Sequence, residues 1–253
     1  MSGKIKLLID YGNSLVKVAF FRDDKMVELH SFDRLISSVL RKLVNNFRAS
    51  HGIPGQKAHA LLSGVREVPP EIITYLTDEF EYLRLDHKTA LPVIVKYKTP
   101  ETLGQDRIAL AVAASGLYPA ENILVIDAGT CITFDFVNKN KEYLGGGISP
   151  GILMRFRALH EFTGKLPLIT QFENSGLIGN TTADSIISGV LNGAVAEVDT
   201  LIDRYRNEFA VEKILLTGGD MIYFDKRLKN NIFAHSNLVL TGLNLILNYN
   251  VGK

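Results

Sequence analysis

The chain has 253 residues, 46% of them hydrophobic and 22% charged, which suits either one large globular domain or two of ordinary size. The net charge of +1 gives no electrostatic basis for a general attraction to nucleic acid or to an anionic membrane. The single cysteine, Cys131, excludes a disulfide framework. No apolar run approaches the roughly 18 uninterrupted residues of a membrane span. We therefore expect a cytoplasmic protein without nucleic-acid or membrane partners.

The first half of the chain begins with a predicted meander of three antiparallel strands. Its strands and turns are strand 5–10, turn 12–14, strand 15–21, turn 22–25 and a third strand ending near residue 30. Apolar residues then recur at helical spacing over 35–47, with Asp33 placed to cap the helix. Two short strands, 58–62 and 82–85, follow with a helix between them.

The second half repeats this organisation. Its meander consists of strand 123–127, turn 129–130, strand 131–137, turn 138–141 and a third strand ending near residue 148. Helices over 152–160 and 182–209 precede a strand at 213–216, and a last helix fills the C-terminus. Each half is thus three antiparallel strands followed by alternating helices and strands. This pattern predicts two α/β domains of like build, 1–117 and 118–253.

Both meanders carry the same four-residue signature where the first strand turns into the second. The copies are Asp10-Tyr11-Gly12-Asn13 and Asp127-Ala128-Gly129-Thr130. One Asp-x-Gly is weak evidence, because turns use these residues widely, but its repetition at the same place favours a function. A glycine turn lets backbone N–H groups approach phosphate oxygens, and a carboxylate can hold a cation that bridges to phosphate.

Other chemistries find no support in the sequence. The chain has no P-loop and no dinucleotide-binding glycine fingerprint. Its six histidines are scattered and, with one cysteine, offer no zinc cluster. Lys17 lies one strand beyond the first turn and could neutralise transferring charge, although a solvated strand lysine is the simpler interpretation.

The chain resembles the type III pantothenate kinases, a family of the actin-like ATPase superfamily. The motifs that carry the resemblance, in chain order, are residues 10–14, Gly104-Gln105-Asp106-Arg107, residues 127–133, residues 146–151, residues 163–167 and Thr217-Gly218-Gly219-Asp220. They span nearly the whole chain, and the ordered set is specific although each motif alone is not. Two positions depart from the family pattern, Ser14 where Thr is common and Cys131 where Ala is usual.

The resemblance implies two duplicated actin-like (ribonuclease H-like) domains with an ATP cleft between them. It implies ATP-dependent phosphorylation of pantothenate to 4′-phosphopantothenate, the first step toward coenzyme A. The co-substrate would be ATP with Mg²⁺, and Asp127 would hold a required monovalent cation, K⁺ or NH₄⁺. The residues implied at the ATP site are Asp10, Tyr11, Gly12, Asn13, Ser14, Leu15, Val16, Lys17 and Thr130.

The resemblance also implies a pantothenate site near the interface of a homodimer. Its residues would be Tyr97, Gly104, Gln105, Asp106, Arg107 and Thr182, with Asp106 as the catalytic base. The helix 182–209 carries apolar residues on more than one face, which fits either a dimer or a helix wholly buried in its own domain.

From the residues alone, ordinary interpretations of this second set stay open. Asp106 and Arg107 could form a surface ion pair, Tyr97 could serve packing, and Thr182 could be a helix N-cap. Two other functions also stay open. One is a kinase of another small hydroxylated substrate in the same superfamily, and the other is a non-catalytic homologue that affects transcription. The short chain and the Gly104–Arg107 motif favour the pantothenate kinase over the first, and the presence of Asp106 and the low net charge favour it over the second.

Overall fold

The computed structural model describes residues 5–51, 58–173 and 176–251. The chain divides into two compact units, the first formed by Met1–Gly116 with Leu238–Lys253 and the second by Leu117–Asn237. The first break falls beside the expected boundary at residue 117. The expected second domain, 118–253, included the C-terminal helix α7 (Leu238–Val251), which here belongs to the first unit.

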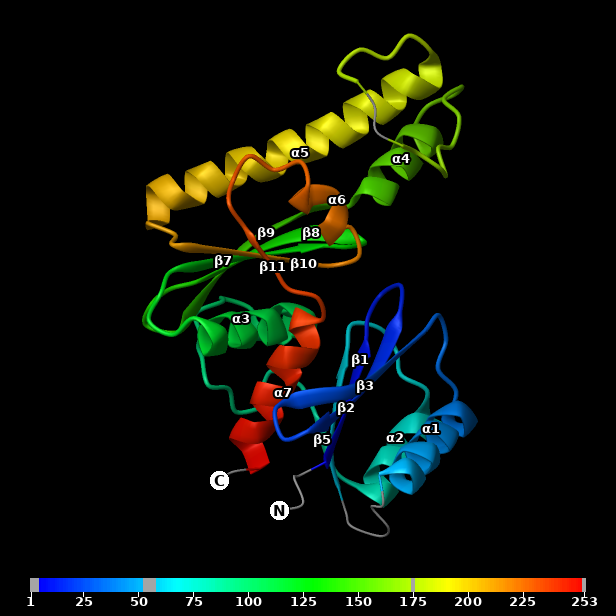
Figure 1. The fold of residues 1–253 in the computed structure, drawn as a ribbon, viewed down its shortest axis with the longest axis vertical. Helices are drawn as coiled ribbons and strands as arrows, with labels where there is room; N and C mark the ends of the chain where they lie inside the picture. The colour runs from blue at the N-terminus through cyan, green and yellow to red at the C-terminus, as the bar shows by residue number, and fades with distance from the viewer. Residues whose placement is uncertain (1–4, 52–57, 174–175, 252–253) are drawn as a thin grey trace. The chain divides into compact units, whose positions relative to one another are not determined.

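A five-stranded mixed sheet forms the centre of the first unit (Figure 1). Its strands are β1 (Ile5–Tyr11), β2 (Val16–Arg22), β3 (Lys25–Phe32), β4 (Ala58–Gly64) and β5 (Phe80–Arg84), in the order β3-β2-β1-β4-β5. The first three strands are antiparallel, whereas β4 and β5 run parallel to β1. This is the predicted meander followed by a parallel extension.

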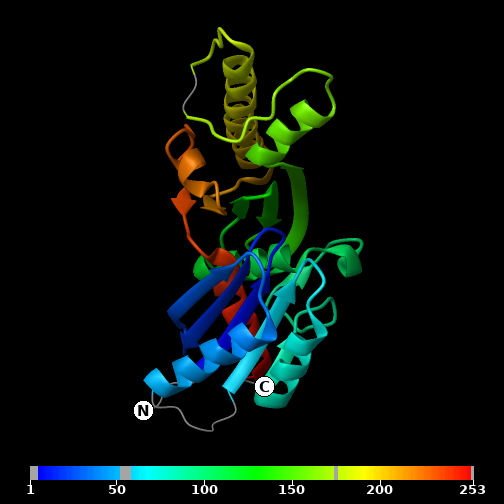
Figure 2. The same ribbon diagram turned by 90° about the vertical axis from the view of Figure 1, so that its right-hand side faces the viewer.

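Helices cover both faces of this sheet. α1 (Ser37–Ser50) and α2 (Pro70–Glu79) pack on one face, and α7 packs against β1 and β4 (Figures 1 and 2). β1 is accordingly buried along almost its whole length, as a strand covered on both faces should be. The short strand β6 (Ile94–Val95) and the 3₁₀ helix η1 (Pro100–Thr102) lead to α3 (Gln105–Leu117).

The predicted cap of α1 is wrong. The helix begins at Ser37, and its N-cap residue is Ile36, which provides no side-chain hydrogen bond. The chain is still extended at Ile36, so Asp33 lies too far before the first helical turn to cap it.

The second unit repeats the topology of the first. Five strands of its sheet are β7 (Ile123–Ala128), β8 (Cys131–Val137), β9 (Glu142–Pro150), β10 (Lys213–Thr217) and β11 (Phe233–Ala234), which follow one another in the order β11-β10-β7-β8-β9. Again the first three strands are antiparallel and the last two run parallel to the first. The predicted duplication is confirmed.

Helix α5 (Thr182–Phe209) crosses the second unit with α4 (Ile152–Glu161) beside it, and α6 (Met221–Asp225) follows β10 (Figures 1 and 2). Ile186, Leu191 and Val198 of α5 are buried in the core. Among the described residues α5 is the single helix long and apolar enough, by length and composition alone, to cross a membrane, yet its buried face is that of a core helix. α5 is not buried on every face, since Asn192 and Ala196 are exposed. Its apolar residues Ile187, Val195 and Leu201 nevertheless pack against the same core.

Candidate functional site

The first signature forms the tight connection between β1 and β2. Asp10 is 8% exposed and lies opposite Lys17 across the antiparallel pair. Asn13 and Ser14 are exposed at the turn. A Cβ on Gly12 would lie 2.9 Å from the carbonyl oxygen of Leu15, so the turn closes most easily around a glycine. The structure thus brings Asp10, the glycine turn and Lys17 together.

Two of the residues predicted for ATP face the core of the first unit instead. Val16 is fully buried, and the Tyr11 hydroxyl donates a hydrogen bond to the Leu35 carbonyl oxygen at 3.2 Å. Burial raises the pKa of the Tyr11 hydroxyl, and the Arg66 guanidinium lies 5.2 Å from its ring centroid. The side chains of Tyr11 and Val16 therefore pack in the core of the first unit and stabilise the turn.

The motif that begins α3 lies at the same end of this sheet. β4 runs beside β1, with Ser63 opposite Asp10 and Gly64 opposite Tyr11. The backbone N–H of Gly64 donates to Oε1 of Gln105 at 2.7 Å. The carboxyl ends of parallel strands share one edge, where α/β proteins commonly bind ligands. The fold of the first unit thus places Gly104–Arg107 next to the strand end that carries the first turn.

Asp106 and Arg107 occupy the first turn of α3. Asp106 is half-buried, and its Oδ1 accepts a hydrogen bond from the backbone N–H of Arg107 at 2.8 Å. A helix N-terminus favours negative charge, so the carboxylate suits this place. A Cβ on Gly104 would approach Asp106 Oδ1 to 2.5 Å, so a side chain at this position would displace the carboxylate. Arg107 is only 5% exposed, with its guanidinium 5.9 Å from the Tyr97 ring centroid, so the surface ion-pair interpretation is wrong.

The second signature connects β7 and β8. Asp127 is half-buried at the end of β7, opposite Thr133 on β8 and Thr217 on β10. The Gly129 N–H donates to the Cys131 carbonyl oxygen at 2.9 Å, which closes the turn. Thr130 is exposed. This turn has the same position in its sheet as the first turn has in the other.

Two glycines from later segments of the chain, Gly151 and Gly218, lie in close contact with this second turn. A Cβ on Gly151 would lie 2.2 Å from the Gly129 carbonyl oxygen. A Cβ on Gly218 would lie 2.4 Å from Asp127 Oδ1, and Gly218 has a φ of +100°, a conformation that other residues rarely adopt. The turn therefore depends on the absence of side chains at both positions.

Asp220 belongs to the same group, although it was not among the predicted site residues. Its backbone N–H donates to the Ala128 carbonyl oxygen at 2.8 Å, which ties the segment after β10 to the second turn. Burial raises the pKa of the Asp220 carboxyl, a perturbation typical of functional sites. The signal that could have found it was the Thr217–Asp220 motif directly after a buried strand.

The donor groups near Asp127 limit the kind of cation that this chain could hold. Within the described ranges, no group of three or more His, Cys, Asp and Glu side chains is arranged to hold a metal ion. A divalent ion would therefore need substrate phosphates and water as further ligands, as Mg²⁺ commonly does. One carboxylate with nearby hydroxyl and carbonyl oxygens also fits a hard monovalent cation.

Thr182 begins helix α5 of the second unit. It is exposed, while the N-cap is Thr181, whose Oγ1 accepts a hydrogen bond from the Asp184 N–H at 3.1 Å. The N-cap interpretation of Thr182 is therefore wrong by one residue. The start of α5 lies beside α4 rather than over the strands (Figure 1).

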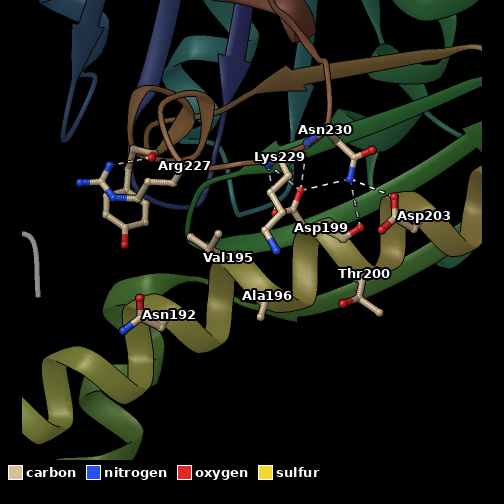
Figure 3. A pocket seen from close by; sticks show the side chains of 10 residues that line it. Asn192, Val195, Ala196, Asp199, Thr200, Asp203, Arg227, Lys229 and Asn230 are labelled. Carbon is tan, nitrogen blue, oxygen red and sulfur yellow. Dashed lines mark hydrogen bonds between the residues drawn. The ribbon is translucent and has the colours of Figure 1, made fainter. Parts of the chain in front are cut away.

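A pocket of about 470 Å³ lies between α5 and the segment after α6 (Figure 3). None of the residues predicted for ATP, pantothenate or the cation lines it. Asp199, which lines it, accepts hydrogen bonds from the backbone N–H groups of Lys229 and Asn230 at 3.0 and 3.3 Å. This carboxylate thereby holds the segment against α5, a structural role.

Solved structures resemble the chain over nearly its whole length. A ROK hexokinase from Thermus thermophilus aligns with a TM-score of 0.53 at 11% identity, covering 98% of this chain and 99% of that one. Component A of the (R)-2-hydroxyglutaryl-CoA dehydratase from Acidaminococcus fermentans aligns with a TM-score of 0.53 at 12% identity, covering 99% and 100%. At such identities the likeness shows the fold alone, and this fold is that of the actin-like ATPases.

Sequence comparison gives the family. Residues 6–204 match the sequence model of the type III pantothenate kinases. A type III pantothenate kinase from Christiangramia forsetii is 41% identical over 246 residues, covering 97% of this chain and 99% of the relative. One from Bacteroides fragilis strain YCH46 is 40% identical over 252 residues, covering 98% and 100%. The chain belongs to the type III pantothenate kinase family.

Proposed function

We propose that this protein transfers a phosphoryl group from ATP to pantothenate and forms 4′-phosphopantothenate, the first step of coenzyme A biosynthesis. The observation that carries the proposal is the position of the Gly104–Arg107 motif beside the strand end that bears Asp10 and Gly12, in a chain of this family. A phosphate-binding turn and an acceptor-activating carboxylate are two of the parts that phosphoryl transfer needs.

ATP is proposed to bind to residues 10–17 of the first unit and to Thr130 of the second. The exposed Asn13 and Ser14 offer donors beside a glycine turn, which leaves room for phosphate oxygens. Lys17 lies across from Asp10 and contributes positive charge. Tyr11 and Val16 act as supports of the turn, since their side chains are buried. Mg²⁺ would be held mainly by the phosphates, with few protein ligands.

A monovalent cation, K⁺ or NH₄⁺, is proposed to bind at Asp127. The half-buried carboxylate lies at the end of β7 beside a glycine turn, where phosphate binding would add further negative charge. A cation there would supply positive charge that balances the carboxylate and the phosphate oxygens.

Pantothenate is proposed to contact Tyr97, the Gly104–Arg107 segment and Thr182, with Asp106 as the base. The Asp106 carboxylate would orient the substrate hydroxyl and accept its proton late in the transfer, because the transition state is loose. The bond from the Arg107 N–H and the helix N-terminus both stabilise its negative charge. The buried Arg107 would hold an anionic part of the substrate.

A homodimer in the cytoplasm is proposed as the working form. α5 leaves Asn192 and Ala196 exposed, and Leu177 and Ile178 just before it are 84% and 88% exposed. Apolar side chains so exposed next to the Thr182 end of α5 are typical of a protein interface. Sedimentation of the full chain at micromolar concentration tests this, and a monomer would contradict it.

The proposed activity is tested by coupled measurement of ADP release with and without pantothenate, and by mass spectrometry of the product. We expect ADP release to depend on pantothenate and the product to gain one phosphoryl group. Equal or faster turnover with sugars or short hydroxy acids in the same assay would favour another kinase activity. No ADP release with any acceptor would contradict a kinase.

A further inference from the structure

One hydrogen bond joins the two motifs of the first unit. Pairing between β4 and β5 ends at Leu62 and Arg84, two residues before the end of β4. Directly after β4, the Val65 N–H points toward β1 and donates to the Tyr11 carbonyl oxygen at 3.2 Å. The N–H groups of successive strand residues point to opposite sides, so the Gly64 N–H points toward the β5 side, where the pairing has ended. Gln105 Oε1 fills the place of the missing strand partner at 2.7 Å.

This bond leaves little freedom for the segment that carries Asp106. Gln105 is the first residue of α3 and directly precedes Asp106. Its bond partner, Gly64, lies opposite Tyr11 in the sheet, one residue from the Asp10–Ser63 pair. A Cβ on Gly64 would lie 3.2 Å from the Cβ of Tyr11, so β4 and β1 are closely packed at this end. The path from the first turn to Asp106 is therefore short, since it consists of one strand pairing and one hydrogen bond.

We propose that Gln105 is a positioning residue, which fixes Asp106 relative to the first phosphate turn through the Gly64 N–H. The acceptor oxygen of Gln105 serves the protein, and this side chain does not bind pantothenate through it. The inference rests on the proposed function, because the position of Asp106 matters only if it acts on a substrate held at this edge. A small misplacement of a reacting group can lower turnover about 100-fold, so such a bond has a measurable effect.

Two substitutions separate positioning from direct binding. Gln105→Met keeps the length of the side chain but removes the acceptor, whereas Gln105→Glu keeps an acceptor oxygen and removes the amide donor. Gln171→Met, at an exposed position of the second unit, is the matched control. For each variant we would measure kcat, KM for pantothenate, KM for ATP, the thermal midpoint and, by NMR, hydrogen exchange of the Gly64 amide without substrates.

We expect Gln105→Met to lower kcat by about 10- to 100-fold, with KM for ATP changed by less than about twofold. Gly64 amide exchange should accelerate in this variant. Gln105→Glu should restore slow exchange and most of kcat, and Gln171→Met should match the wild type.

Three outcomes would overturn the inference. The first is wild-type turnover in Gln105→Met, and the second is a fast-exchanging Gly64 amide in the wild type. The third is a loss in Gln105→Glu as large as in Gln105→Met while exchange stays slow, which would assign the amide donor to the substrate. If the wild type has no kinase activity, the proposed function fails, while the exchange measurement still decides whether the bond forms.

Discussion

The turns after β1 and β7 occupy equivalent places in two sheets of the same topology, yet their surroundings differ. The first turn is open, with Asn13 and Ser14 exposed, and the neighbouring strand β4 is bonded to α3 through Gly64 and Gln105. The second turn also leaves Thr130 exposed, but its backbone is closely packed against Gly151 and Gly218, which come from later segments of the chain. Duplication therefore supplied a common scaffold, and the segments that follow each meander gave the two copies different surroundings.

The difference suggests a division of roles. An open turn beside the α3 N-terminus suits contact with both nucleotide and acceptor. A turn packed against glycines, with the Asp127 carboxylate at its start, suits a cation next to phosphate. Variants that act on one turn and spare the other can test this division.

The largest effect is expected for Asp106→Asn, which keeps the shape of the side chain but loses the proton acceptor. Turnover with pantothenate should fall about 10²- to 10⁴-fold, the usual contribution of a general base, while KM for ATP changes little. Steady-state kinetics with both substrates measures this. Asp78→Asn on the exposed surface of α2 is the control. Near-normal turnover would exclude Asp106 as the base, and loss of ATP binding would move the residue to the nucleotide site.

A slightly smaller effect is expected for Asp127→Asn, which removes the proposed cation ligand. Turnover should fall about 10²-fold, as for other lost electrostatic contacts to a reacting group, and stimulation by K⁺ or NH₄⁺ should vanish. Asp10→Asn, the equivalent change in the first unit, should weaken ATP binding and keep the response to K⁺. Turnover rates of the wild type and of both variants in sodium and potassium buffers measure this dependence on the monovalent cation. Equal wild-type rates in both buffers would refute a monovalent cation site.

Gly218 and Gly219 offer a third test, which concerns the packing of the turn after β7. Gly218→Ala places a Cβ 2.2 Å from the Ala128 carbonyl oxygen at a φ of +100°, whereas Gly219 has no atom within 4 Å of its added Cβ. We expect Gly218→Ala to lower the free energy of unfolding by about 1–3 kcal/mol, and Gly219→Ala to change it by less than about 0.5 kcal/mol. Thermal unfolding measures both variants. Equal midpoints for the two would show that the turn is not closely packed.

The smallest effect concerns pH and the anchoring of α7. Hydrogen bonds from Asn248, the largest cause, hold the pKa of Asp24 below its usual range. Since the folded-state pKa is lowered, this stabilisation is fully present above the unfolded pKa of about 3.9 and is lost as pH falls through the folded value. Asp24→Ala should lower the free energy of unfolding by less than about 1 kcal/mol at pH 6, because the carboxylate is largely exposed.

The pH series supplies the check on Asp24. The difference between Asp24→Ala and the wild type should shrink as the pH is lowered from 6 toward about 3. Asp78→Ala, which lies on the surface of α2, should show no such trend. A difference that stays constant over this range would mean that the Asp24 charge does not anchor the helix.

The sequence predicted well those features that depend on neighbouring residues. Both meanders, their turns and the bounds of the 182–209 helix follow from hydrophobic period and turn residues, and the structure has them. The prediction was wrong where backbone geometry selects the residue. Thr181 is the cap of α5 because its backbone is extended and its hydroxyl accepts a hydrogen bond from the Asp184 N–H. Two adjacent threonines give a sequence pattern no basis for choosing between them.

The candidate site divides in the same way. The motifs identify Asp10, Asp106 and Asp127 from the sequence, whereas the bond between Gly64 and Gln105 joins residues 41 apart along the chain. That contact depends on where the pairing between β4 and β5 ends, and no local sequence pattern predicts where two paired strands separate. For the same reason Gly218 was recognised as part of a motif, but its approach to Asp127 was not.

Helix α7 shows the physical origin of this limit most clearly. The sequence determined that an apolar helix ends the chain, and a helix of that kind can cover any open face of a sheet. Tertiary structure decided that it covers the first unit. Asn244 and Asn248 donate hydrogen bonds to Asp24 at 3.0 and 2.7 Å, and the buried Lys6 donates to Asn248 at 2.6 Å. A Cβ on Gly242 would lie 1.9 Å from the Ala109 carbonyl oxygen, so only a glycine permits this packing against α3. Hydrophobic burial is not directional, and these polar and steric contacts, made across more than 100 residues of chain, select one face among several.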